Sequence, residues 1–295
     1  MRFEYLEPAS IDEVIDILKT NAGKAKILAG GTDLVVQMKQ GTQKPDIVIH
    51  IGGITALEGI LPEAGGGLRI GTLTTMRTLE RSPLLQGGYD VLRQGAAQVS
   101  CPQIRNVATL GGNSCNGIPS ADSVPSLIAL GAQALVRGWR GERKIPMEAF
   151  HRGPGQTVLE ADELLLGFEI PPPPPSTGGS YLKYTPRGTS ELSVVGVAAL
   201  LTLDPQDETC RQARIALGAC APTPMRAKQA ESILVGNRLN DSLIAMAAEK
   251  ASEEARPNPG ISVRASASYR REMVKVWGKY ALKNAFCKAK ASILH

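Results

Sequence analysis

Aromatic residues, histidines and paired cysteines are scarce in this chain. Phenylalanine, tyrosine and tryptophan make up 4% of the 295 residues, and they do not interleave with basic residues as in nucleic-acid surfaces built on stacking. None of the five cysteines forms a Cys-x-x-Cys pair, which argues against an iron–sulfur cluster or zinc site held by this chain alone. The histidines, His50, His151 and His295, are isolated. We therefore expect no metal site and no nucleic-acid partner.

Long apolar runs and a secretion signal are absent as well. No stretch is long enough to cross a membrane as a helix, and no signal peptide precedes the first predicted strand. With the unpaired cysteines, this predicts a reducing, cytoplasmic setting. The net charge of +5 is mild. Basic residues are denser after Arg256, where their helical spacing predicts a solvated face or a face against an acidic partner chain.

One stretch, residues 104–122, departs from regular patterning. A β-branched, half-apolar run leads into Gly111 and Gly112, and a small polar segment then ends at Asp122. Adjacent glycines let a backbone approach a bulky anion, which successive free N–H groups and the Thr109 hydroxyl could cradle. The stretch is neither a P-loop nor the Gly-x-Gly-x-x-Gly dinucleotide fingerprint. A plain glycine-rich connection between a strand and a helix is the alternative interpretation.

A second turn of this composition lies about eighty residues earlier in the chain. Residues 26–29 form a predicted strand that runs into Gly30-Gly31-Thr32-Asp33, and residues 34–39 suit a short helix. Each of the two turns has a hydroxyl and an aspartate nearby. Two such turns fit a diphosphate held from both sides, and coincidence of turn chemistry is the alternative.

The remaining pattern predicts alternating strands and helices, then a mixed region, then a separate C-terminal domain. Five prolines, Pro171–Pro175, favour an extended segment and cannot continue a sheet, so they mark a boundary. Strands followed by helices after this boundary indicate an α+β layer. The predicted strands cover 179–184, 194–203 and 210–218, and the predicted helices cover 227–234, 242–254 and 269–288.

Taken together, the motifs resemble the FAD-binding medium subunit of molybdenum hydroxylases, the family that includes xanthine dehydrogenase and carbon monoxide dehydrogenase. The resemblance covers nearly the whole chain. It rests on Ile27-Leu-Ala-Gly-Gly-Thr-Asp-Leu34, Pro102-Gln-Ile-Arg-Asn-Val-Ala-Thr-Leu-Gly-Gly-Asn113, Pro119-Ser-Ala-Asp-Ser123, Glu163-Leu-Leu-Leu, Tyr181-Leu-Lys-Tyr, Ala221-Pro-Thr-Pro-Met-Arg-Ala227 and Ser268-Tyr-Arg-Arg271. It implies an α+β protein with a vanillyl-alcohol-oxidase-type FAD-binding fold of two α/β subdomains, residues 1–58 and 59–175. An α+β domain of the CO dehydrogenase flavoprotein type, residues 176–295, would follow.

The resemblance also implies which residues bind the cofactor. Residues 27–34 would wrap the FAD diphosphate with backbone N–H groups, and the second turn would form the other jaw. Asp122 would accept from a ribose or ribityl hydroxyl, because a carboxylate is no phosphate ligand. Lys183 would stabilise negative charge on the reduced flavin ring. The implied set is Ile27, Leu28, Ala29, Gly30, Gly31, Thr32, Asp33, Leu34, Val99, Thr109, Gly111, Gly112, Asn113, Asp122, Leu165 and Lys183, with no catalytic acid–base residue in this chain.

The function implied by this resemblance is electron relay within a heteromeric complex, arranged as a dimer of heterotrimers. A large subunit with a molybdopterin cofactor would hydroxylate a small molecule, and two [2Fe–2S] clusters in a small subunit would pass electrons to FAD. NAD⁺ or another acceptor would then oxidise the flavin. The Cys-Asn-Gly-x-Pro-Ser-Ala-Asp loop favours a purine or xanthine substrate over carbon monoxide, an aldehyde or an N-heteroaromatic compound.

Two further expectations and two rival functions complete the sequence interpretation. Neither Gly-Gly turn contains a histidine, so a covalently tethered flavin is not expected, and FAD would be the only redox centre of this chain. The rivals are a stand-alone flavin oxidoreductase of the same fold and a nucleotide-binding interaction module without a redox role.

Overall fold

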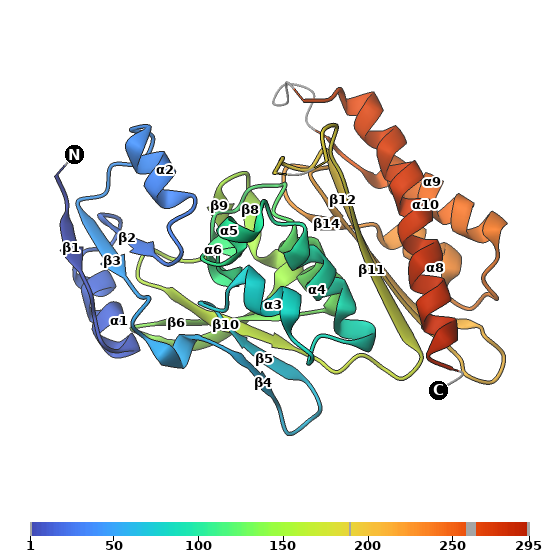
Figure 1. Cartoon of the computed structure of the whole chain (residues 1–295), viewed down its shortest axis with the longest axis horizontal. Helices are drawn as coiled ribbons and strands as arrows, with labels where there is room; N and C mark the ends of the chain where they lie inside the picture. Colours follow the sequence, from blue (N-terminus) through green and yellow to red (C-terminus); the bar gives the residue numbers. More distant parts are fainter. Residues whose placement is uncertain (1, 189, 258–263, 294–295) are drawn as a thin grey trace.

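The computed structural model describes residues 2–188, 190–257 and 264–293. His295, one of the isolated histidines, lies outside these described residues. Three layered units follow one another along the chain and along the long axis of the molecule (Figure 1). The strands and helices predicted for the C-terminal domain are present, and the structure adds the short strand Met225–Arg226 to them.

The N-terminal unit is a small parallel sheet covered by one helix. Its elements are β1 (Glu4–Leu6), α1 (Ile11–Thr20), β2 (Ala25–Leu28), α2 (Leu34–Lys39) and β3 (Ile47–His50), and the strand order is β1-β3-β2. Helix α1 begins where the Ser10 hydroxyl accepts from the Glu13 N–H, a common N-cap arrangement. Its buried residues Val14, Ile15 and Leu18 recur at helical spacing and pack on the sheet.

The middle unit is built on a five-stranded antiparallel sheet of order β4-β5-β10-β6-β7. Helices α3, α4 and α7 contribute buried residues to the same core as the central strand β10. The elements are η1 (Thr55–Leu57), β4 (Ile60–Pro62), β5 (Leu68–Gly71), α3 (Met76–Arg81), η2 (Gly87–Tyr89), α4 (Asp90–Ala97), α5 (Pro102–Arg105), α6 (Leu110–Cys115), α7 (Ser123–Leu130), β6 (Gln133–Gly138), β7 (Gly141–Pro146), η3 (Met147–Ala149), β8 (His151–Gly153), β9 (Gln156–Thr157) and β10 (Leu164–Ile170).

The run before Gly111 corrects the expectation of a strand entering a glycine-rich loop. Pro102 starts the short helix α5, because its fixed φ and missing N–H suit the first helical position. Thr109 then caps α6 by accepting from the Gly112 N–H at 3.0 Å. Gly111 and Gly112 therefore lie in the first turn of a helix and not in a loop.

The C-terminal unit is a four-stranded antiparallel sheet with three helices. Its elements are β11 (Thr177–Tyr184), β12 (Val195–Leu203), β13 (Cys210–Gly218), β14 (Met225–Arg226), α8 (Lys228–Leu234), α9 (Asp241–Glu254) and α10 (Ala267–Ala291), and the strands lie in this order. Helix α10 lies along β11 and β12 (Figure 1). Between the middle and C-terminal units, Pro173 lies against Gly88, where an added Cβ would be 2.5 Å from the Pro173 side chain.

The basic residues of α10 are only partly the solvated face that the sequence predicts. Arg270 is buried and donates to the carbonyl oxygens of Val194 and Ala219. A buried guanidinium is costly without such acceptors. Four lysines form ion pairs with acidic residues of this chain: Lys275 with Glu249, Lys283 with Asp241, Lys288 with Asp90, and Lys290 with Glu208.

Two negative findings hold for the residues that the structure describes. None of their helices is both long enough and apolar enough to span a membrane. No group of three or more histidine, cysteine, aspartate or glutamate side chains is arranged to hold a metal ion in this part of the chain.

Close packing of β11 on α10 gives a stability prediction. A Cβ added at Gly178 would lie 2.2 Å from the Ala285 carbonyl oxygen and 2.3 Å from the Ala289 nitrogen, and helix backbone has little room to move. We expect Gly178→Ala to lower the free energy of unfolding by about 1–3 kcal/mol, measured by urea denaturation. Gly53→Ala is the matched control, because nothing lies within 4 Å of its added Cβ. Equal effects of the two substitutions would contradict this packing argument.

Candidate cofactor-binding site

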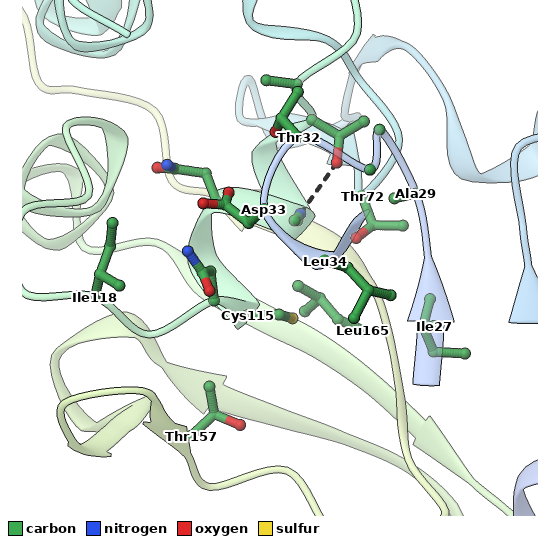
Figure 2. A pocket seen from close by; sticks show the side chains of 18 of the residues that line it. Ile27, Ala29, Thr32, Asp33, Leu34, Thr72, Cys115, Ile118, Thr157 and Leu165 are labelled. Atoms are coloured by element: carbon green, nitrogen blue, oxygen red, sulfur yellow. Dashed lines mark hydrogen bonds between the residues drawn. The ribbon is translucent and has the colours of Figure 1, made fainter. Parts of the chain in front are cut away.

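A cleft of about 710 Å³ opens where the three units meet. Its volume lies within the range of about 300–1,000 Å³ that is usual for ligand sites. Ile27 of β2 and Ala29 and Thr32 of the β2–α2 connection line it, together with Leu165 of β10 and Cys115 of α6 (Figure 2). Of the residues that the sequence implied for the cofactor, all but one line this cleft.

Leu28 is the exception, because it does not line the cleft. It ends strand β2, where it pairs in register with His50. Its side chain lies under the turn, since a Cβ added at Gly31 would be 3.3 Å from the Leu28 Cδ1. Successive residues of a strand point to opposite sides, so Ile27 and Ala29 reach the cleft and Leu28 does not.

The first glycine turn, residues 30–34, presents a row of unpaired backbone donors. Within the described chain, none of its five N–H groups donates to a protein acceptor. Gly31 has φ +71°, a left-handed conformation that glycine adopts without steric cost. Consecutive N–H groups around such a turn form a concave anion site. The unpaired donors at this turn are the groups that the expected anion cradle requires.

The second glycine turn differs, because its backbone donors are already used. The Leu110 N–H donates to Thr74 O and the Gly111 N–H to Thr72 O, each at 2.9 Å. The Gly112 and Asn113 N–H groups both donate to Thr109, the first to its hydroxyl and the second to its carbonyl. The expectation of free N–H groups here is wrong, since these donors bind the helix cap and the segment before α3.

The polar groups that this second turn offers to a ligand are side chains. Thr109 accepts through its hydroxyl oxygen and keeps its own O–H to donate. Asn113 accepts from the Ser123 hydroxyl at 2.7 Å through Oδ1, which leaves its amide NH₂ as a donor. Gly111 is required for packing, because an added Cβ would lie 1.7 Å from the Thr72 hydroxyl.

The two turns lie in direct contact with each other. A Cβ added at Gly30 would lie 1.9 Å from the Val107 carbonyl oxygen. Only glycine, which has no Cβ, fits at this position. Gln37 donates to the Asn116 side chain at 3.3 Å across the same boundary. Burial raises the pKa of Asp33, and a hydrogen bond with Asn116 opposes this rise.

A buried ion pair between Asp122 and Lys183 forms another part of the cleft wall. The Lys183 Nζ lies 2.7 Å from Asp122 Oδ2, and the two side chains are 4% and 8% exposed. The same ammonium donates to the Gln98 carbonyl at 3.0 Å, at the C-terminal end of α4. Burial raises the pKa of Asp122, and the adjacent Lys183 ammonium opposes that rise. Because the partners are buried together, removing either one would leave an uncompensated charge.

Tyr181 completes this network, and the sequence interpretation assigned it no role. Its hydroxyl donates to Asp122 Oδ1 at 2.8 Å. Burial and the neighbouring Asp122 raise the pKa of the Tyr181 phenol well above its usual 10, so it acts as a neutral donor. Tyr181 and Lys183 are two residues apart in β11, and strand alternation places both on one face. The two-residue spacing from Lys183 within one predicted strand is the sequence signal that could have placed Tyr181 beside the ion pair.

Comparison with known proteins assigns the family. Residues 1–173 match the FAD binding domain in molybdopterin dehydrogenase, and residues 180–285 match the CO dehydrogenase flavoprotein C-terminal domain. The chain belongs to this family. The implied mixed fold and FAD as the cofactor of this chain are thereby confirmed, and the chain is a FAD-binding subunit of a molybdenum hydroxylase, an oxidoreductase.

Individual relatives match over nearly their full lengths. A putative xanthine dehydrogenase FAD-binding subunit of Escherichia coli (strain K12) is 35% identical over 286 residues, 97% of this chain and 96% of the relative. The carbon monoxide dehydrogenase medium chain of Hydrogenophaga pseudoflava is 32% identical over 97% of this chain and 98% of its own. A structure of carbon monoxide dehydrogenase from that organism superposes with a TM-score of 0.92 at 32% identity, covering 98% of both chains.

His151 gives a pH-dependent prediction for this flavin subunit. It lies in the β8–β9 hairpin beside the cleft, where its Nε2 is 2.9 Å from the Ser114 carbonyl oxygen. Burial lowers the pKa of His151 below its usual 6.5. Below pH 6.5 the unfolded chain therefore binds more protons than the folded chain. Stability should fall as pH drops toward the folded pKa, by at most about 1.4 kcal/mol per pH unit.

The measurement is the thermal unfolding midpoint of wild type and His151→Gln at pH 7.5 and pH 5.5. Carboxylates titrate alike in both proteins, so the difference between the two profiles isolates His151. We expect wild type to lose more stability than the variant over this interval. Parallel profiles would show that His151 titrates alike in the folded and unfolded chains.

Proposed function

We propose that the cleft holds one FAD and that this chain relays electrons from the iron–sulfur clusters of a small partner subunit, through that FAD, to NAD⁺ or another acceptor. One observation carries the proposal. Five unpaired backbone N–H groups of residues 30–34 lie in the same cleft as a buried, hydrogen-bonded lysine. The N–H groups would bind the diphosphate of FAD, and the lysine would lie beside its flavin ring.

The residues of the first turn fit the diphosphate. Its N–H groups would donate to phosphate oxygens, and the Thr32 hydroxyl would add a further donor. Thr109 and Asn113 approach from the other side with an O–H and an amide NH₂. Gly112 leaves the space over this turn open, since its added Cβ would meet only the Thr109 hydroxyl, at 2.9 Å.

The residues around Lys183 fit the flavin end. A lysine ammonium has three N–H donors, and Gln98 and Asp122 use two of them. The third would donate to an acceptor on the ring, and the positive charge would stabilise the reduced form. Each Asp122 oxygen retains a lone pair for a ribityl hydroxyl. Val99 and Leu165 supply apolar wall. When bound, FAD supplies the redox chemistry.

We propose that the assembled enzyme is a dimer of heterotrimers. Each heterotrimer contains this chain and two further chains. A large subunit holds molybdopterin and hydroxylates the substrate, and a small subunit carries two [2Fe–2S] clusters. A purine or xanthine substrate is proposed because the loop from Cys115 to Asp122 favours it. The E. coli relative named for xanthine dehydrogenase supports the same choice.

Composition of the purified complex tests the relay. We expect the tagged chain to co-purify with two other chains, one FAD per copy, molybdenum and iron. Elemental analysis and the flavin absorption spectrum measure these contents. A stoichiometric complex that contains neither metal would contradict the relay. A chain that turns over an organic substrate by itself would support the rival stand-alone oxidoreductase.

Substitution at Gly30 tests the cleft itself. The added Cβ of Gly30→Ala would strike the Val107 carbonyl oxygen and push the first turn off the second. If about 1–3 kcal/mol of this overpacking strain opposes binding, the FAD dissociation constant rises about 5- to 150-fold. Flavin titration of the refilled complex measures it, and Gly53→Ala is the control with open space around its Cβ. Wild-type affinity in Gly30→Ala would remove this contact from the site.

A further inference from the structure

We propose that Tyr181 is a positioning residue for the flavin: its hydroxyl fixes the Asp122 carboxylate so that Lys183 is held at the cleft wall. The inference rests on the proposed FAD site and adds the residue that sets the orientation of its cation. Tyr181 itself does not line the cleft, so any effect on a ligand passes through Asp122 and Lys183.

The structure holds Tyr181 at both ends. Its backbone N–H donates to the Gln94 side chain of α4 at 3.0 Å, and its hydroxyl donates to Asp122. In the neighbouring strand β12, Gly196 pairs with Lys183, and a Cβ there would be 2.6 Å from the Tyr181 hydroxyl oxygen. Glycine at position 196 therefore leaves the space that the hydroxyl occupies.

The hydroxyl matters because it leaves Asp122 one preferred orientation. A carboxylate accepts through both oxygens, and here each oxygen has its own donor: Tyr181 on Oδ1 and Lys183 on Oδ2. Loss of the Tyr181 donor leaves the carboxylate held only by Lys183 and the Ser193 side chain, so it is freer to rotate and its buried oxygens have one donor fewer. The long lysine side chain then loses the fixed anchor that holds its ammonium near the ring.

A purely structural role would give a different result. If Tyr181 only filled space between α4 and β12, its ring alone would suffice. Phenylalanine keeps that ring and removes only the hydroxyl. A change in the reduction potential of bound FAD would therefore report on the charge network and not on packing.

The experiment measures the FAD midpoint potential in the purified complex by spectroelectrochemistry. Lys183→Met removes the cation and should lower the potential. Tyr181→Phe should lower it in the same direction by a three- to tenfold change in the reduction equilibrium constant, about 14 to 30 mV for a two-electron couple. In the double variant the effects should not add, because both act through one ammonium. Tyr184→Phe is the matched control, since its hydroxyl meets Tyr269 on α10 instead.

Each outcome decides the inference. A shift with Lys183→Met but none with Tyr181→Phe overturns the role of Tyr181 and leaves the FAD site intact. No shift with Lys183→Met overturns both the inference and the proposed place of the lysine. If Tyr181→Phe does not fold, Gly196→Ala displaces the hydroxyl without removing it and should lower the potential. An unchanged potential in that variant would also overturn the inference.

Discussion

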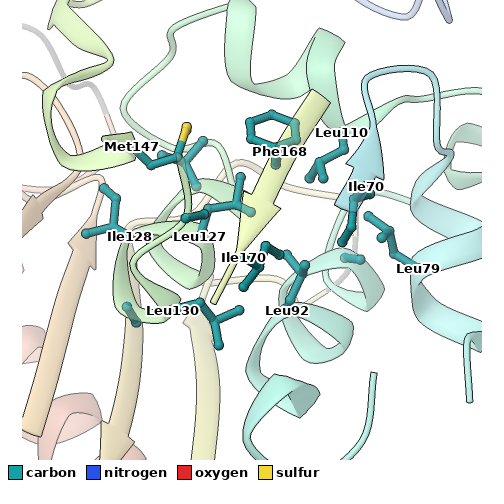
Figure 3. Packing of buried hydrophobic residues seen from close by; sticks show 14 of the residues in the cluster. Ile70, Leu79, Leu92, Leu110, Leu127, Ile128, Leu130, Met147, Phe168 and Ile170 are labelled. Atoms are coloured by element: carbon teal, nitrogen blue, oxygen red, sulfur yellow. The ribbon is translucent and has the colours of Figure 1, made fainter. Parts of the chain in front are cut away.

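The contact between Gly30 and the Val107 carbonyl is the constraint on which the site depends. It presses a turn of the N-terminal unit against the segment before α6, with no room for a side chain between them. Strand β10 links the cores of the N-terminal and middle units, because both of its faces are buried. Leu164 and Leu166 belong to the core of the N-terminal unit. A bulge after Leu165 then places Phe168 and Ile170 in the core of the middle unit (Figure 3).

The two glycine turns share a composition and differ in what they do. In the first turn the backbone is free to donate, and the glycines give it a left-handed bend and a close approach. In the second turn the backbone N–H groups of residues 110–113 all donate to protein acceptors, and Gly111 fits against Thr72. A rigid second turn would suit the proposed site, because its Thr109 and Asn113 side chains would then meet the diphosphate from fixed positions.

Sequence reasoning recovered most elements because their local signals agree with their tertiary roles. Ser10 and Thr75 begin α1 and α3 as N-caps, and Gly131 ends α7 in the left-handed conformation, so residue types that favour caps stand where these helices begin and end. It failed where the deciding partner is distant in the chain. The acceptors for the second turn come from the segment before α3. The buried guanidinium of Arg270 donates to the carbonyl groups of Val194, just before β12, and Ala219, just after β13. Neither contact leaves a periodic pattern, so each required the folded arrangement.

A cation beside a flavin presents a physical conflict that this network resolves. In the proposed site the Lys183 ammonium would lie beside the flavin, yet its side chain is only 4% exposed, and a buried cation requires hydrogen-bond acceptors around it. Its two fixed partners, the carbonyl at the end of α4 and the Asp122 carboxylate, keep the charge in place without bulk water. Asp122 is in turn too buried to stand alone, and Tyr181 supplies its second donor. The three side chains therefore form one electrostatic unit, and their effects on the flavin cannot be divided residue by residue.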